Sequence, residues 1–136
     1  MTFELDGRLA LDTFPVGDLE LCRVLLMDDA RYPWLILVPR RVSVVELVDL
    51  DERDRALLIE EANAAAAFLQ ATRRPDKINI AALGNVVRQF HLHVVARRRG
   101  DPAWPSPVWG HGVAKPYEPL EARRLAAEAR HALRAN

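Results

Sequence analysis

The fold of this protein is indicated by one ten-residue stretch, Arg88-Gln89-Phe90-His91-Leu92-His93-Val94-Val95-Ala96-Arg97. Polar and apolar side chains alternate along it, which is typical of a strand with one face in the core. Because successive side chains of a strand point to opposite faces, Gln89, His91 and His93 are expected on one face and the apolar residues between them on the other. The stretch therefore predicts a strand over 88–97 with two imidazoles and a carboxamide on its non-core face.

The segments around this stretch predict an α+β domain with a mostly antiparallel sheet. A hairpin turn at Asp28-Asp29-Ala30 joins two apolar runs, which are therefore expected to pair antiparallel. The run Ala64–Ala67 favours a long helix, which Pro75 stops. Strands are expected at 19–27, 32–38 and 77–83, long helices at 51–71 and 118–134, and a short helix around 5–11.

Three segments have less regular signals. The pattern Ser43-Val44-Val45-Glu46 is typical of a capping box and predicts a helical region after Arg41. Residues 12–18 contain Pro15 and Gly17 and are expected to form turns. The segment 100–119 has five prolines and two tryptophans and is expected to be an extended arm that precedes the terminal helix.

Composition limits the classes of function. A chain of 136 residues, half of them hydrophobic, fits a single domain over 1–136. The formal net charge is zero, so neither a nucleic acid polymer nor a membrane surface is an expected partner. The single cysteine, Cys22, excludes a disulfide within the chain and is expected to be a small buried residue. With no secretory signal at the N-terminus, a cytoplasmic location is the expectation.

Two histidines on one strand face have three possible roles. An imidazole whose pKa is about 6.5 is largely neutral at cell pH and can attack phosphorus. The same His-x-His pattern can bind a metal, with His111, His131 or Cys22 as the remaining soft donors for a third ligand. Both histidines could also be exposed residues without a role, and the two imidazoles by themselves do not separate these readings.

The wider segment resembles the histidine triad (HIT) family, whose signature is His-φ-His-φ-His-φ-φ with φ apolar. Residues 89–95 match every position except the first, where Gln89 replaces histidine. Residues 34–41 resemble the family's apolar strand that ends in Val-Pro-Lys/Arg, and the long helix follows as in the family. Asp101 and Trp104 resemble the C-terminal part of the family, so the similarity covers roughly residues 20–110.

The resemblance implies a fold, an assembly and a reaction. The family fold is a five-stranded antiparallel sheet with helices, usually paired as a homodimer. His91 takes the position of the nucleophile, which attacks the α-phosphorus of a nucleotide without a cofactor or an obligatory metal. His93 takes the position that hydrogen-bonds the phosphate, and Gln89 would orient its neighbour. The implied and candidate substrate-binding residues are Asn79, Gly84, Asn85, Arg97, Trp104 and His111.

Gln89 also bears on the kind of reaction. A glutamine at the first signature position is nearest to the branch labelled as diadenosine polyphosphate hydrolase-like, and unlike histidine it takes up no proton. We expect a hydrolase or nucleotidyl transferase that acts on diadenosine polyphosphates or nucleoside phosphoramidates. The alternatives are a nucleotide-binding regulatory protein with little turnover and a metal-dependent hydrolase that uses His91, His93 and His111.

Overall fold

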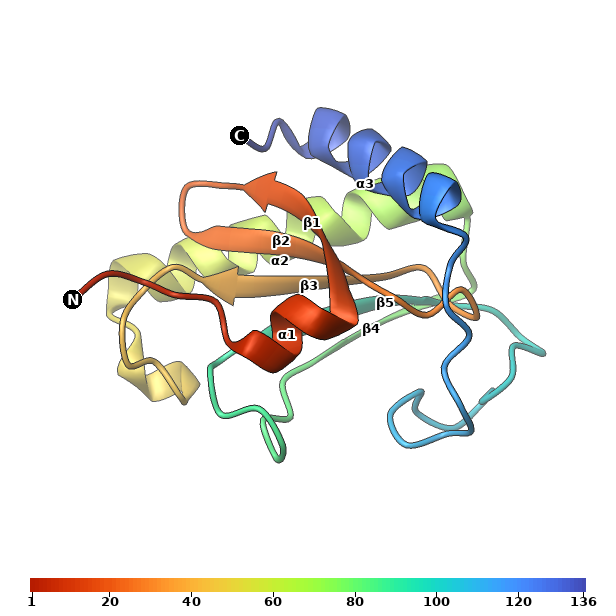
Figure 1. The fold of residues 1–136 in the computed structure, drawn as a ribbon, viewed down its shortest axis with the longest axis horizontal. Helices are drawn as coiled ribbons and strands as arrows, with labels where there is room; N and C mark the ends of the chain where they lie inside the picture. Colours follow the sequence, from red (N-terminus) through yellow and green to blue (C-terminus); the bar gives the residue numbers. More distant parts are fainter.

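The computed structural model describes residues 1–136 and contains a five-stranded sheet with helices on both faces (Figure 1). The strand order is β1-β2-β3-β5-β4, and every neighbouring pair is antiparallel. The predicted α+β class with a five-stranded antiparallel sheet, a long helix and a C-terminal helix is confirmed. In chain order the elements are α1 (Gly7–Asp12), β1 (Thr13–Asp18), β2 (Cys22–Met27), β3 (Trp34–Pro39), α2 (Glu52–Arg73), β4 (Lys77–Ala81), β5 (Leu92–Arg97) and α3 (Pro119–Leu133).

The first strand lies where the sequence predicted turns, so that prediction is wrong. Pro15 is accommodated because β1 is at the edge of the sheet, where one side needs no backbone donor, and a bulge separates Pro15 from Gly17. The C-terminus packs against this strand: Asp18 and Asn136 exchange two backbone hydrogen bonds of 3.0 and 2.9 Å. A Cβ at Gly17 would lie 2.8 Å from the Cβ of Ala135, so the close approach requires glycine.

The expected helical region after Arg41 is much shorter than predicted, and Ser43 does not cap it. Ser43 has a φ of 62°, and only a single 3-10 turn forms, at Leu47–Asp49. The carboxylate of Asp49 accepts the backbone N–H of Glu46 at 2.8 Å, so Glu46, and not Ser43, begins this turn. Helix α2 then starts after Asp51, whose side chain accepts the N–H of Asp54 at 2.8 Å.

The strand that bears the histidines is shorter than predicted. It begins at Leu92, and residues 88–91 form a lead-in outside the ladder, with a bend at Gln89. Phe90 turns its backbone N–H to the carbonyl of Val44, at 2.9 Å, instead of to a neighbouring strand. The prediction that Gln89 shares a strand face with the histidines is therefore wrong, since the period of two does not extend to Gln89.

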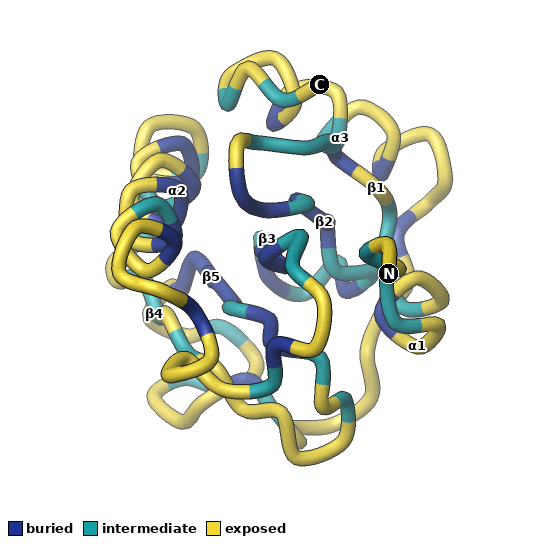
Figure 2. The backbone as a smooth tube through the Cα atoms, turned by 90° about the vertical axis from the view of Figure 1, so that its left-hand side faces the viewer, coloured by how far each residue is buried: buried dark blue, intermediate teal, exposed yellow.

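Both faces of the sheet are covered, as the burial of the central strands shows (Figure 2). Helices α2 and α3 pack on one face over the larger core, which includes Leu92's neighbours Phe90 and Val94 as predicted. Helix α1, the N-terminal segment and the arm cover the other face over a second core that includes Trp34 and Val95. His93 lies on this second face, so the expectation of a non-core face is wrong. None of the helices combines the length and apolarity needed to cross a membrane.

Candidate active site

His91 is held by the backbone of its own lead-in segment. It lies one residue before β5 and is 7% exposed. Its Nδ1 lies 2.7 Å from the carbonyl oxygen of Gln89. A carbonyl oxygen only accepts hydrogen bonds, so the proton of a neutral His91 is on Nδ1. The lone pair is consequently on Nε2, which is the arrangement a nucleophilic imidazole needs.

His93 lies beside it, on the strand itself. The two ring centroids are 4.8 Å apart, and His93 is 6% exposed. Its Nδ1 accepts a hydrogen bond of 3.0 Å from the indole Nε1 of Trp34, which lies on the neighbouring strand β3. Burial, with a smaller contribution from His91, lowers the pKa of His93 to about 3. His93 is therefore neutral throughout the physiological range.

A tryptophan of the arm completes the aromatic surroundings of the histidines. The ring centroid of Trp109 lies 5.2 Å from that of His93 and 5.9 Å from that of Trp34, in edge-on contacts. Both tryptophans of the arm were candidates for stacking on a base and Trp104 was the one named for the site, but it is Trp109 that contacts His93. From the sequence, Trp34 was expected only as a core or sheet-face residue, and the arm has no periodicity that shows which of its tryptophans reaches the sheet.

Arg97, at the end of β5, is the centre of a buried polar cluster. Its guanidinium makes two hydrogen bonds, of 2.8 and 2.9 Å, to the carboxylate of Asp101. It also donates to Asn79 Oδ1 and to the carbonyl of Ser106, each at 2.9 Å. The ring of Trp104 lies 5.6 Å from the same guanidinium. The Arg97 hydrogen bonds hold the pKa of Asp101 below its ordinary value.

This cluster contains three of the residues that the sequence suggested for substrate binding. Arg97 contacts both Asn79 and Trp104 as well as the start of the arm, and it is 1% exposed. Four of its five N–H groups are occupied within the cluster, and the guanidinium is buried, so it is not presented to the distal phosphates of a substrate. The cluster fixes the arm to the sheet, so its effect on the site is indirect, through the placement of Trp109.

The remaining residues that the sequence suggested for substrate binding are not part of the buried surroundings of His91 and His93. Gly84 and Asn85 are exposed in the loop between β4 and β5, where Gly84 has a φ of 77° that favours glycine. His111 is exposed in the arm, and its carbonyl accepts a 2.7 Å hydrogen bond from Arg31. His91, His93 and His111 are not gathered, since no group of three or more His, Cys, Asp or Glu side chains is arranged to hold a metal ion.

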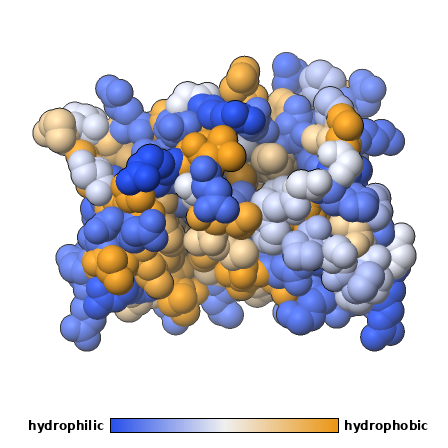
Figure 3. Space-filling view, turned by 90° about the horizontal axis from the view of Figure 1, so that it is seen from below, coloured by the Kyte–Doolittle hydropathy of each residue, from blue (hydrophilic) through white to orange (hydrophobic).

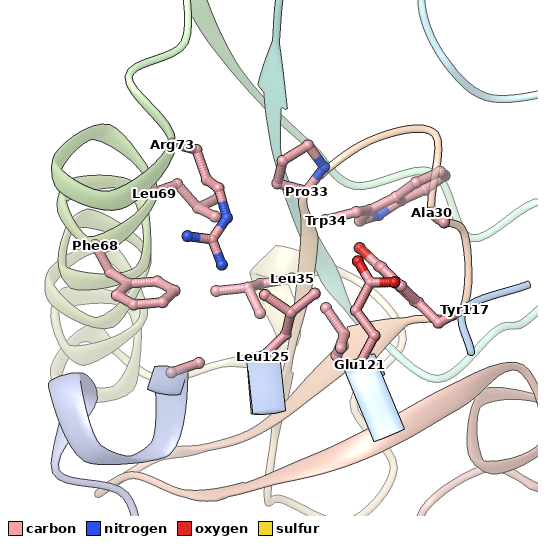
Figure 4. Close-up of a pocket in the computed structure, with 12 residues that line it drawn as sticks. Ala30, Pro33, Trp34, Leu35, Phe68, Leu69, Arg73, Tyr117, Glu121 and Leu125 are labelled. Atoms are coloured by element: carbon pink, nitrogen blue, oxygen red, sulfur yellow. The ribbon is translucent and has the colours of Figure 1, made fainter. Parts of the chain in front are cut away.

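A separate pocket of about 180 Å³ lies between α2, α3 and the sheet (Figure 4). Leu35 and Leu125 are among its mostly apolar lining, with Arg73 and Glu121 as its charged residues. Leu35 pairs with Val94 and points to the face opposite His93, which pairs with Ile36. The pocket is therefore not the cleft in which His91 would meet a substrate.

Cys22 is fully buried at the start of β2, as predicted. Burial, together with the nearby Glu61 carboxylate, raises the pKa of its thiol far above the ordinary value. Glu61 accepts the backbone N–H groups of Leu21 and Cys22, at 2.9 and 2.8 Å. The thiol is thus a packing group and not a nucleophile.

Comparison with known proteins gives close structural relatives. A histidine triad protein from Sinorhizobium meliloti is 52% identical, with a TM-score of 0.93 and 96% of each chain covered. One from Bradyrhizobium japonicum is 44% identical, with a TM-score of 0.94, covering 98% of this chain and 99% of the other. One from Marinobacter aquaeolei is 41% identical, with a TM-score of 0.95 and 98% of each chain covered. No curated protein sequence matches.

A more distant structure shares the fold. The diadenosine triphosphate hydrolase of Plasmodium falciparum is 16% identical, with a TM-score of 0.58, covering 97% of this chain and 78% of the other. The family model described as the HIT domain matches residues 8–100, which is more than half of the chain. With the fold, the histidine pair and the close relatives in agreement, this chain belongs to the HIT family.

Proposed function

We propose that this protein is a nucleotide-phosphate hydrolase or nucleotidyl transferase that forms a nucleotidyl-histidine at His91. The observation that carries the proposal is the hydrogen bond from His91 Nδ1 to the carbonyl of Gln89, which leaves the Nε2 lone pair free. The proposed substrates are diadenosine polyphosphates or nucleoside phosphoramidates. Support for this class comes from the glutamine-type signature and from the shared fold of the Plasmodium falciparum diadenosine triphosphate hydrolase.

The proposed reaction has two displacements at one phosphorus atom. His91 Nε2 attacks the α-phosphorus, an N–P bond forms, and the P–O or P–N bond to the leaving group breaks with its electron pair. Water, or another acceptor, then attacks the same phosphorus and breaks the N–P bond, which regenerates His91. His93 hydrogen-bonds a non-bridging oxygen and stabilises the charge that develops there.

The test of this proposal is the mass of the intact protein. The protein is mixed with diadenosine polyphosphates or an adenosine phosphoramidate and quenched without acid, because a phosphorus–nitrogen bond is labile in acid. A nucleotide-sized adduct is expected in the unsubstituted protein and in the exposed-histidine control His131→Ala, but not in His91→Ala. An adduct that persists in His91→Ala, or full hydrolysis by that variant, would overturn the proposal.

A nucleotide-binding regulatory role is the second candidate, and the position of Gln89 favours it. The Gln89 carboxamide is engaged with the N-terminal segment through hydrogen bonds to Glu4 and Asp6, and it supplies no proton to a leaving group. This role predicts measurable nucleotide affinity, by calorimetry, with no adduct and no product from any of the same compounds.

We also propose a homodimer formed through α2 and the free edge of β4. Strand β4 ends the sheet, so its outer backbone groups have no partner strand. Next to it lies an apolar groove of about 320 Å³ between α2, β4 and the start of β5. Apolar side chains gather on the face seen in Figure 3. Ile59 and Ile80, both of which line the groove, are 62% and 49% exposed. A second copy would cover these side chains and hydrogen-bond to the free edge of β4.

We also propose a cytoplasmic location, which is in keeping with the free thiol of Cys22.

A further inference from the structure

Trp34 contacts the histidine pair through a polar atom as well as through its ring. It is the first residue of β3 and lies opposite Val95 of β5, on the face of the sheet that carries His93. Its Nε1 donates to His93 Nδ1 at 3.0 Å, while the two rings meet at 60° with centroids 5.7 Å apart. Trp34 is 4% exposed, so water does not compete for this hydrogen bond.

The chemistry of the two groups determines where the His93 proton lies. An indole N–H donates and never accepts, so His93 Nδ1 must supply a lone pair. In a neutral imidazole the proton is then on Nε2. A proton on Nδ1 would place two donors against each other in a dry site, and it would leave the buried indole N–H without a partner. The low pKa of His93 means that the doubly protonated ring does not interfere.

We propose that Trp34 is a positioning residue for the reaction at His91: its indole N–H holds His93 as the tautomer that carries its proton on Nε2. This inference rests on the proposed function. In that tautomer His93 presents a donor beside a nucleophile, which is what a phosphoryl oxygen with growing negative charge requires. The other tautomer would present a lone pair there and repel the same oxygen.

Trp109 offers an internal comparison. Its ring also contacts His93, at 5.2 Å between centroids, but its Nε1 is buried and has no hydrogen-bond partner. The two tryptophans therefore differ in one respect that matters here: only Trp34 donates to His93. Replacing one N–H or the other separates the effect of the hydrogen bond from that of aromatic packing.

The direct test is nitrogen NMR of the His93 ring in the full-length protein. Incorporation of β-(3-benzothienyl)alanine in place of Trp34 keeps the fused rings and replaces the N–H with sulfur. We expect an unprotonated Nδ1 in the natural protein and a substantial fraction of protonated Nδ1 in the analogue. The same replacement at Trp109 is expected to leave the His93 tautomer unchanged. A proton on Nδ1 of the natural protein, or an analogue at position 34 with the natural tautomer, would overturn the inference.

The kinetic test asks whether this hydrogen bond serves the reaction. The analogue at position 34, and the simpler Trp34→Phe, should lower kcat by about 10- to 100-fold with little change in KM, because the lost interaction acts on charge in the transition state. A tautomer change with unchanged kcat would overturn the positioning role. If the natural protein turns over no nucleotide, the proposed function fails, whereas the NMR result still decides whether Trp34 fixes the tautomer.

Discussion

Gln89 accepts a hydrogen bond from the backbone N–H of Asp6 at 2.8 Å, although the two residues are 83 positions apart in the chain. The same carboxamide donates from Nε2 to the carbonyl of Glu4 at 2.9 Å. Gln89 thus fixes the N-terminal segment with its side chain while its own backbone carbonyl holds His91. The residue that departs from the family signature links the N-terminus to the proposed nucleophile.

Replacing Gln89 with histidine should loosen the N-terminal segment. Along one edge of a carboxamide, an N–H and an oxygen lone pair run nearly parallel, whereas the N–H and the lone pair of a neutral imidazole diverge strongly, so histidine cannot make both hydrogen bonds. We expect Gln89→His to cost about 1–2 kcal/mol in free energy of unfolding and to speed amide hydrogen exchange at Asp6. Exchange measured by NMR checks this, and unchanged protection of Asp6 would contradict it. The matched control is the exposed helix residue Gln70, where Gln70→His should leave Asp6 protected.

Arg97 should tolerate no conservative replacement. Lysine keeps the charge but cannot form the paired contacts with Asp101 while it also reaches Asn79. With side-chain exposures of 2% and 8%, the Arg97–Asp101 pair is screened little by water. Arg97→Lys is therefore expected to lower the free energy of unfolding by about 2–4 kcal/mol.

Urea unfolding provides the measurement for Arg97, with an exposed ion pair as its control. Arg53 pairs with Glu20 at side-chain exposures of 70% and 62%, so Arg53→Lys should change stability by less than about 1 kcal/mol. Losses of equal size at the two positions would show that the buried cluster is not a special source of stability.

His93 should make stability depend on pH in a defined window. Its pKa is about 3 in the folded protein and near 6.5 in the unfolded chain. Between these values the unfolded chain binds the additional proton, so stability is retained above 6.5 and falls as the pH drops toward 3. The slope from this one group approaches about 1.4 kcal/mol per pH unit.

The pH effect of His93 can be isolated by comparing urea unfolding of the natural protein with that of His93→Gln. Glutamine does not titrate, and its oxygen can accept the Trp34 N–H. Because the carboxylates contribute to both proteins, the difference between the two pH curves reports the histidine. Curves that remain parallel below pH 6.5 would refute the prediction.

The proposed dimer should separate when its apolar groove acquires a charge. Ile80→Glu would bury an unpaired carboxylate beside the edge of β4, which is expected to weaken association by about 2 kcal/mol or more. Light scattering during gel filtration over a range of concentrations measures this. Leu11→Glu, on the exposed side of α1 at 83% exposure, is the control that should leave the assembly intact. A natural protein that is monomeric at all concentrations would contradict the proposal.

The hydrophobic pattern of the sequence was sufficient to predict the central helices and strands of the fold. The apolar runs that became β2 and β3, the alanine-rich segment that became α2, and the alternation in β5 are local signals that agree with their tertiary environment. Periodicity failed at β1, where the strand is defined by its partner β2 and by the C-terminus, and at Ser43, where a capping pattern was not followed by a helix.

The sequence by itself determined the family, the α+β class and the pair of histidines at the start of β5, because these are carried by short-range patterns. Only the tertiary structure placed Trp34 and Trp109 against His93, joined Gln89 to Asp6, and drew Arg97 into a cluster with Asn79 and Asp101. Apart from Arg97 and Asp101, which are four positions apart, these contacts connect residues far apart in the chain, and Trp109 lies in an arm without periodicity. The hydrogen bonds of Trp34 and Arg97 are strengthened because the folded chain excludes water from these two side chains, which no local pattern encodes.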